Sequence, residues 1–139
     1  MLEYTQSGSI VGMSTKAKLQ VALDFVEFDR AMAVAKSAVA GGADYIEAGT
    51  PLIKSEGLDA VRKLRAAFPN KTIIADLKTM DAGRIEAEGA AKAGANVMTV
   101  LGAADESTIR ECVEAGQHYG IEVAVDLLGL ADPIAFAKR

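Results

Sequence analysis

"TIIADLKTMD", residues 72–81, joins an uninterrupted apolar run to three charged side chains. Its first part, residues 72–75, is rich in β-branched residues and has no polar break, which is typical of a strand buried on both faces. Because side chains alternate along a strand, Asp76 and Lys78 are expected to project to the same side. The segment therefore predicts a carboxylate and an ammonium group side by side at the C-terminal end of a strand.

Asp81 follows three residues after Lys78 and stands directly before a helical pattern. At this position its side chain can cap the helix and can also face the space that Lys78 faces. Two interpretations of the D-x-K-x-x-D pattern stay open at this point. It is either a structural ion pair with a helix cap or part of a functional site.

The composition narrows the classes of protein to consider. The chain has 139 residues, half of them hydrophobic, and a formal net charge of −4, which suits one globular domain with a sizeable core. No cluster of Lys and Arg suggests a nucleic-acid or acidic-membrane partner, so small-molecule chemistry is favoured. The single cysteine, Cys112, cannot form a disulfide framework and is expected to be a packed thiol. With no apolar stretch near the roughly 18 residues of a membrane span, a cytoplasmic protein is expected.

A strand followed by a helix recurs about every 25 residues along the chain. Residues 1–18 show neither periodicity and are interpreted as an N-terminal extension, and residues 19–139 as the N-terminal portion of a domain built from this unit. Strands are expected at 19–24, 44–49, 72–78, 96–101 and 121–128, and helices at 28–41, 57–68, 82–94, 107–119 and from 133 onwards. Two architectures use this unit: the open doubly wound sheet and the closed barrel of eight strands.

The positions of the acidic residues favour the barrel. The dinucleotide fingerprint G-x-G-x-x-G and the P-loop are both absent from the sequence, which weakens the doubly wound alternative. Four acids fall at or near the C-terminal ends of the expected strands, at the rim where barrels build their active sites: Asp24, Glu47, Asp76 and Asp126. Four carboxylates on one rim repel each other unless a cation, a lysine or hydrogen bonds offset them, so a metal-assisted site is favoured over four separate caps. The predicted fold class is α/β, a portion of a (β/α)8 TIM barrel with about five parallel strands.

Five ordered blocks at these strand ends resemble a known family. They are LQVALD at 19–24, YIEAGTPLI at 45–53, IIADLKTMDAG at 73–83, VMTVLGAADESTI at 97–109 and VAVDLLG at 123–129. The sequence is similar to the orotidine-monophosphate-decarboxylase-like barrels, and among them to the 3-hexulose-6-phosphate synthases. The metal-free orotidine-monophosphate branch has a lysine where this chain has Glu47. The 3-keto-L-gulonate-6-phosphate decarboxylases are the alternative, since they share Glu47 but tend to carry Glu in place of Asp126.

The resemblance implies a reaction and roles for the residues. The reaction is the reversible aldol addition of formaldehyde to D-ribulose 5-phosphate through an enediolate, an aldehyde-lyase activity of the ribulose monophosphate pathway. The resemblance implies that Mg²⁺ is held by Glu47 and Asp76 and that the catalytic residues are Lys78, Asp76 and Asp81. It assigns substrate binding to Asp24, Lys78 and Asp126. It further implies a homodimer in which Asp81 reaches the active site of the neighbouring subunit.

A barrel has eight strand-helix units, and this sequence supplies five. By the resemblance, the family's strand-six histidine and the phosphate-binding turns fall beyond Arg139, so we expect the chain to hold only the metal half of the site and to be inactive by itself. His118, at the end of a helix, is expected to be a surface or capping histidine and no substitute. An alternative of another class is a non-catalytic half-barrel that acts as a binding or assembly module.

Overall fold

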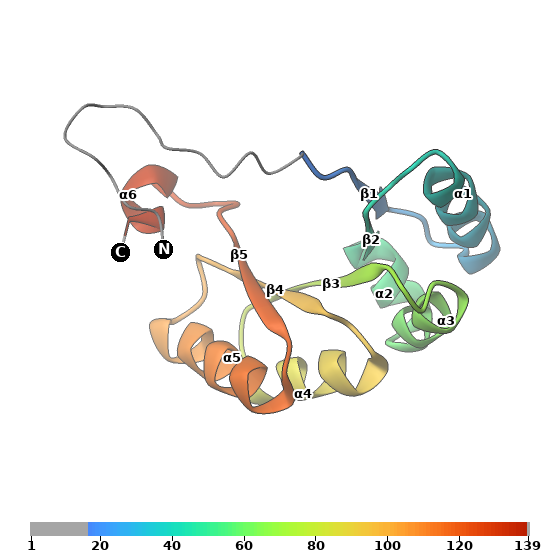
Figure 1. Ribbon diagram of the computed structural model, residues 1–139. Coiled ribbons are helices and arrows are strands. Elements are labelled where there is room, and N and C mark those ends of the chain that lie inside the picture. The colour runs from blue at the N-terminus through green and yellow to red at the C-terminus, as the bar shows by residue number, and fades with distance from the viewer. Residues whose placement is uncertain (1–16, 139) are drawn as a thin grey trace.

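The structure is a computed structural model that describes residues 17–138. Within these residues, five strands alternate with helices along the chain, as Figure 1 shows. In chain order the elements are β1 (Gln20–Leu23), α1 (Phe28–Ala40), β2 (Tyr45–Ala48), α2 (Thr50–Glu56), α3 (Asp59–Ala67), β3 (Thr72–Thr79), α4 (Gly83–Ala93), β4 (Val97–Leu101), α5 (Glu106–Tyr119), β5 (Glu122–Asp126) and α6 (Pro133–Ala137).

The strands form one parallel sheet in the order β1-β2-β3-β4-β5, so each strand pairs with the next one in the sequence. A doubly wound sheet reverses its strand order at a switch point, whereas consecutive barrel units add each new strand to the same edge. The helices α3, α4 and α5 lie on one side of the sheet (Figure 1). The described residues are therefore five consecutive units of a (β/α)8-type barrel, which confirms the predicted fold class.

The two faces of the sheet have different side chains. The face toward the helices is apolar and fully buried at Leu23, Ile46, Ala48, Ile73, Ala75, Met98 and Val100. These side chains pack with small and aliphatic residues of the helices, namely Ala31, Ala35, Leu52, Val61, Leu64, Ala87, Ala90, Cys112 and Ala115. Because side chains alternate along each strand, the opposite face holds Glu47, Asp76 and Thr99. The core thus lies on one face, and the polar residues of the strands gather on the other.

A short helix, α2, was not predicted from the sequence. It starts immediately after β2 and has Pro51 in its first turn, where the missing backbone N–H costs no hydrogen bond. It ends at Glu56, and the following C-cap residue Gly57, with a positive φ of 67°, separates it from α3. The consequence for function is that Thr50, its first residue, is placed beside β3.

The prediction that Asp81 caps the following helix was wrong. The N-cap of α4 is Ala82, which is left-handed with a φ of 52°, and no side chain accepts a hydrogen bond there. Because α4 starts at Gly83, Asp81 stands one residue too early and is exposed to solvent. Two other helices do have side-chain caps: Asp105 accepts from Ser107 N at 2.9 Å at the start of α5, and Asp132 accepts from Ala135 N at 2.9 Å at the start of α6.

Cys112 and His118 occupy the positions that the sequence predicts for them. Cys112 is fully buried, with its Sγ 3.6 Å from the carbonyl oxygen of Gly83, and His118 is exposed with its ring edge-on to Tyr119. None of the helices in residues 17–138 combines the length and the apolar character needed to cross a bilayer. The predicted N-terminal extension, residues 1–18, lies outside the described residues except for its last two. Of these, Lys18 pairs with Asp44 at 3.0 Å beside the start of β2.

Candidate active site

Asp76 is the centre of the polar face. It is only 5% exposed, and both of its carboxylate oxygens accept hydrogen bonds. Oδ1 accepts from Thr99 Oγ1 at 2.8 Å and from Lys78 Nζ at 3.0 Å, and Oδ2 accepts from Thr50 Oγ1 and Lys78 Nζ, both at 2.8 Å. A carboxylate offers about four lone-pair positions, so this carboxylate is saturated with donors.

Lys78 reaches Asp76 because β3 bulges at this point. The register with β4 runs from Ala75–Met98 to Thr79–Val100, so four steps along β3 match two steps along β4. Lys78 has a left-handed backbone with a φ of 48°, which is unusual for a residue with a Cβ. Its ammonium group lies between Asp76 and Asp126, with Nζ 2.9 Å from Asp126 Oδ2. The bulge therefore produces a carboxylate–ammonium–carboxylate array across the ends of β3 and β5.

Glu47 and Asp24 bring further negative charge to the same rim. Glu47 lies on β2 opposite Ile74 of β3, so Asp76 follows two residues further toward the rim. Gln20 Nε2 donates to Glu47 Oε2 at 2.5 Å. Asp24 directly follows β1, and its Oδ1 lies so close to the backbone of Gly49 that a Cβ there would stand 2.2 Å away. All four predicted acids thus meet at one end of the sheet.

The electrostatics differ between these acids. Burial acts to raise the pKa of Asp76, but hydrogen bonds from Lys78, Thr99 and Thr50 outweigh it and hold the pKa below its usual value. The hydrogen bond from Lys78 likewise lowers the pKa of Asp126, and the bond to Asp76 raises the pKa of Lys78 despite partial burial. Burial raises the pKa of Glu47, and the negative charges of Asp76 and Asp24 add to this, although the Gln20 hydrogen bond opposes it. Asp76 and Asp126 each form an ion pair with Lys78, whereas Glu47 forms none with the described residues.

A profile of the orotidine 5'-phosphate decarboxylase / HUMPS family matches residues 17–139. The chain belongs to this family. Two curated relatives are 3-hexulose-6-phosphate synthases, one from Mycobacterium gastri with 50% identity over 122 residues and one from Methylomonas aminofaciens with 47% over 123 residues. Each alignment covers 88% of this chain and 58% of the relative, so the chain spans less than two thirds of the length of these relatives.

Solved structures of the family agree with the fold. A crystal structure of 3-hexulose-6-phosphate synthase superposes with a TM-score of 0.84 at 48% identity, covering 88% of this chain and 58% of that one. A 3-keto-L-gulonate-6-phosphate decarboxylase from Vibrio cholerae O1 biovar El Tor str. N16961 superposes with a TM-score of 0.83 at 39% identity, covering 89% and 57%. The resemblance read from the five sequence blocks is confirmed at the level of the family.

The residues present fit a hard divalent cation in part. Within residues 17–138, no three His, Cys, Asp or Glu side chains come together closely enough to hold a metal ion by themselves. Mg²⁺, however, is commonly held by one or two carboxylates and keeps several waters. In the described part of the chain, the hydrogen bond from Gln20 occupies only Oε2 of Glu47, so this carboxylate retains lone pairs for a cation. Asp76 would become a ligand only if one of its four hydrogen-bond contacts were broken.

The sequence predicted most of the polar residues that the structure brings together at this rim, but two of them were missed. Asp24, Glu47, Asp76, Lys78 and Asp126 were predicted, and the structure brings them together. Asp81 is not brought to them, since it is exposed and instead adds its charge beside Glu86, whose pKa rises mainly through burial. The threonines at positions 50 and 99, which both donate to Asp76, were missed. Thr99 could have been found from its position in β4, since it alternates with Met98 and Val100 and so faces the polar side of the sheet. The position of Thr50 could not be predicted, because it belongs to the helix α2 that the sequence analysis missed.

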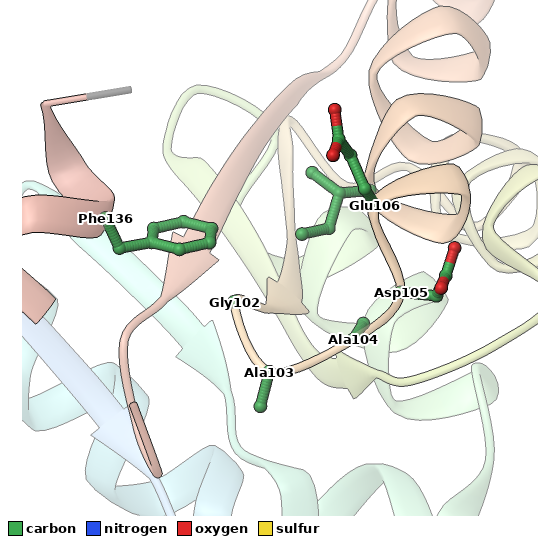
Figure 2. Close-up of a pocket in the computed structure, with 7 residues that line it drawn as sticks. Gly102, Ala103, Ala104, Asp105, Glu106 and Phe136 are labelled. Carbon is green, nitrogen blue, oxygen red and sulfur yellow. The ribbon is translucent and has the colours of Figure 1, made fainter. Parts of the chain in front are cut away.

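A separate hollow lies at the same rim but outside this array. It has a volume of about 690 Å³ and is lined by the β4–α5 loop and α6, at Gly102, Ala103, Ala104, Asp105, Glu106, Ile109 and Phe136. Figure 2 shows Phe136 projecting toward the loop at residues 102–104. Its lining contains none of the predicted site residues, and Asp105 is already engaged as the cap of α5. The candidate site is therefore the polar face of the sheet and not this hollow.

Proposed function

We propose that the protein is a 3-hexulose-6-phosphate synthase, which adds formaldehyde to D-ribulose 5-phosphate to give D-arabino-3-hexulose 6-phosphate. The observation that supports this most is the Asp76–Lys78–Asp126 array beside Glu47, at the rim where barrels of this type build active sites. The identity of 50% and 47% with two curated 3-hexulose-6-phosphate synthases supports the same assignment.

The chemical problem is the removal of a proton from a carbon next to the substrate carbonyl. Negative charge then develops on two adjacent oxygens, and the resulting carbon nucleophile forms a carbon–carbon bond with formaldehyde. The C=O π bond of formaldehyde breaks, and its oxygen takes up one proton, which balances the proton lost from carbon. Lys78 donates to an oxygen that gains negative charge, while Asp76 and Asp126 hold its ammonium group in place. Asp24, exposed beside β2, accepts hydrogen bonds from sugar hydroxyls.

Glu47 and Asp76 are proposed to hold Mg²⁺. When bound, this cation acts as a Lewis acid that stabilises negative charge on neighbouring substrate oxygens. Glu47 contributes a carboxylate with open lone pairs, and its pKa is raised chiefly by burial and further by the negative charges of Asp76 and Asp24. Asp76 would supply the second carboxylate once a donor moves aside, such as Thr50, whose single proton can also serve the carbonyl oxygen of Asp76.

Association is the remaining part of the proposal. The protein is proposed to be a cytoplasmic homodimer in which Asp81 extends into the site of the neighbouring subunit. The exposed position of Asp81 and of its neighbour Met80, which is 51% exposed, supports this assignment, because neither side chain is used within its own rim.

The test is an assay of the protein expressed from its gene. Incubation with formaldehyde, D-ribulose 5-phosphate and Mg²⁺ should consume formaldehyde, and Lys78→Gln should slow this by about 10²- to 10³-fold, as expected when a group that stabilises developing charge is removed. Lys36→Gln, on the exposed side of α1, is the matched control and should retain the activity. Equal rates for Lys78→Gln and Lys36→Gln contradict the proposed role of Lys78.

A second candidate is the decarboxylation of 3-keto-L-gulonate 6-phosphate, favoured by the superposition on a decarboxylase of that name with a TM-score of 0.83. The same preparation distinguishes the two, because preferential turnover of 3-keto-L-gulonate 6-phosphate moves the assignment to the decarboxylase. Turnover of neither substrate favours the non-catalytic binding or assembly module.

A further inference from the structure

The hydroxyl of Thr99, on β4, bridges the backbone of Lys78 and the carboxylate of Asp76 on the neighbouring strand β3. Its Oγ1 accepts a hydrogen bond from the backbone N–H of Lys78 at 2.9 Å and donates to Asp76 Oδ1 at 2.8 Å. A threonine hydroxyl has one proton. Because the Lys78 N–H can only donate, the proton of Thr99 must point toward Asp76, so the direction of both hydrogen bonds is fixed.

Thr50 is different, although it also contacts Asp76. Its Oγ1 lies 2.8 Å from Asp76 Oδ2 and 2.9 Å from the backbone carbonyl oxygen of Asp76. Both partners are acceptors, so its single proton serves only one of them at a time. Thr50 therefore supports Asp76 without fixing one arrangement, whereas Thr99 fixes it.

The backbone of Lys78 needs this hydrogen bond. Residues 76–78 of β3 fall in the bulge between the paired positions 75 and 79, where the regular ladder with β4 is interrupted. A buried or half-buried N–H without a partner is costly, and the left-handed conformation of Lys78 is disfavoured for a residue with a Cβ. The Thr99 hydroxyl takes the place of the missing ladder bond at the residue where the strand is most distorted.

We propose that Thr99 is a positioning residue: its hydroxyl locks the bulged backbone of Lys78 and the carboxylate of Asp76 into one arrangement. The ammonium group of Lys78 then stands between Asp76 and Asp126, and Oδ1 of Asp76 has a fixed orientation toward the rim. The effect of Thr99 on turnover rests on the proposed function, whereas its effect on the Lys78 backbone does not.

The test uses three variants of the protein expressed from its gene. Thr99→Val removes the hydroxyl and keeps the shape of the side chain, and Thr99→Ser restores the hydroxyl. Thr79→Val is the matched control. Thr79 lies on β3, where it pairs with Val100 of β4, but it faces the apolar side of the sheet. Its Oγ1 has no hydrogen-bond partner in the described part of the chain.

The first readout is hydrogen exchange of the Lys78 amide, followed by NMR. Thr99→Val should speed this exchange by about tenfold or more because the acceptor is lost, while Thr99→Ser and Thr79→Val should exchange like the unsubstituted protein. Unchanged protection of the Lys78 amide in Thr99→Val overturns the proposal.

The second readout is steady-state turnover of formaldehyde and D-ribulose 5-phosphate. Thr99→Val should lower kcat by about 10- to 100-fold with a smaller change in KM, since misplacement of a reacting group by about 1 Å can cost that much, and Thr99→Ser should recover most of the rate. An unchanged kcat in Thr99→Val, in a protein that does turn over these substrates, overturns the catalytic consequence of the positioning. If the unsubstituted protein has no turnover and the Lys78 amide still follows the hydroxyl, the proposed function fails and the positioning role of Thr99 stands.

Discussion

The two faces of the sheet are formed by the same strands but differ in chemistry, since one is apolar and the other is polar. On the helix side, Met98 and Ala75 are paired neighbours with no exposed surface, and their contribution is the removal of apolar area from water. On the other side, β3 and β4 carry polar side chains, and the hydroxyl of Thr99 donates a hydrogen bond to the charged carboxylate of Asp76. One face can thus be changed to test stability, and the other to test function.

The bulge in β3 interrupts the regular alternation of side chains between the two faces. A regular strand would continue the pairing of Ala75 with Met98 residue by residue, yet Thr79 is the next residue paired with β4. The extra residues turn Lys78 toward Asp76 and return Thr79 to the apolar side. The distortion therefore belongs to the polar face, and the apolar face resumes its packing beyond it.

The largest expected loss of stability comes from the apolar face. Met98→Ala should lower the free energy of unfolding by about 2–5 kcal/mol, because it removes a fully buried side chain and leaves a cavity. Chemical denaturation monitored by circular dichroism measures this. A loss of less than about 1 kcal/mol would show that the helix-facing side is not packed as described.

A pair of glycines in α4 tests how closely the helices approach each other. A Cβ on Gly83 would stand 2.4 Å from the carbonyl oxygen of Thr108 in α5, so Gly83→Ala should cost about 1–3 kcal/mol through overpacking. A Cβ on Gly89 would meet only the end of the Leu58 side chain at 3.1 Å, so Gly89→Ala should be neutral or stabilising by up to about 1 kcal/mol. Thermal melts of both variants provide the comparison, and equal destabilisation by the two would be inconsistent with the close contact between α4 and α5.

Most of the fold and part of the site could be predicted from the sequence. The strand-helix repeat and the acids at the strand ends are local patterns, and they identified Asp24, Glu47, Asp76, Lys78 and Asp126. The helix α2 was missed because its seven residues, Thr50–Glu56, are too few to show a clear period. The cap at Asp81 was misplaced because the left-handed turn at Ala82 is a tertiary effect, imposed on a residue that does not favour it. Thr99 was missed because its partners lie on another strand and depend on the bulge.

The buried thiol of Cys112 gives the apolar face a pH dependence of its own. Burial raises the pKa of Cys112 from 9.0 to about 11, with smaller effects from Glu111 and Glu86. The folded chain therefore holds this proton more tightly than the unfolded chain, so its contribution to stability is complete below pH 9 and is lost as the pH rises toward 11. Relative to Cys112→Ala, the unsubstituted protein should lose about 1–3 kcal/mol across that range in urea unfolding. A difference that stays constant with pH would argue against the shifted pKa.

The smallest effect concerns two threonines on opposite faces. Within the described residues, Thr79 Oγ1 is buried without a hydrogen-bond partner, so Thr79→Val should stabilise the protein by about 0.5–1 kcal/mol. The same substitution at Thr99, whose hydroxyl has two partners, should destabilise it by about 1 kcal/mol. The melting temperature should rise in Thr79→Val and fall in Thr99→Val. Shifts of the same sign would contradict the different hydrogen bonding of the two hydroxyls.

Calorimetric titration with Mg²⁺ tests the proposal that the polar face holds a cation through the open carboxylate of Glu47. The protein expressed from its gene should bind the ion, and Glu47→Gln should weaken binding by about 100-fold or more while its melting temperature stays within a few degrees, since the substitution keeps the shape of the side chain. Glu122→Gln is the matched control, because Glu122 begins β5 and lies beside Tyr45 and Thr72 at the opposite ends of the strands. Of the two variants, only Glu47→Gln should bind the ion more weakly. Equal affinity of the unsubstituted protein and Glu47→Gln would contradict it.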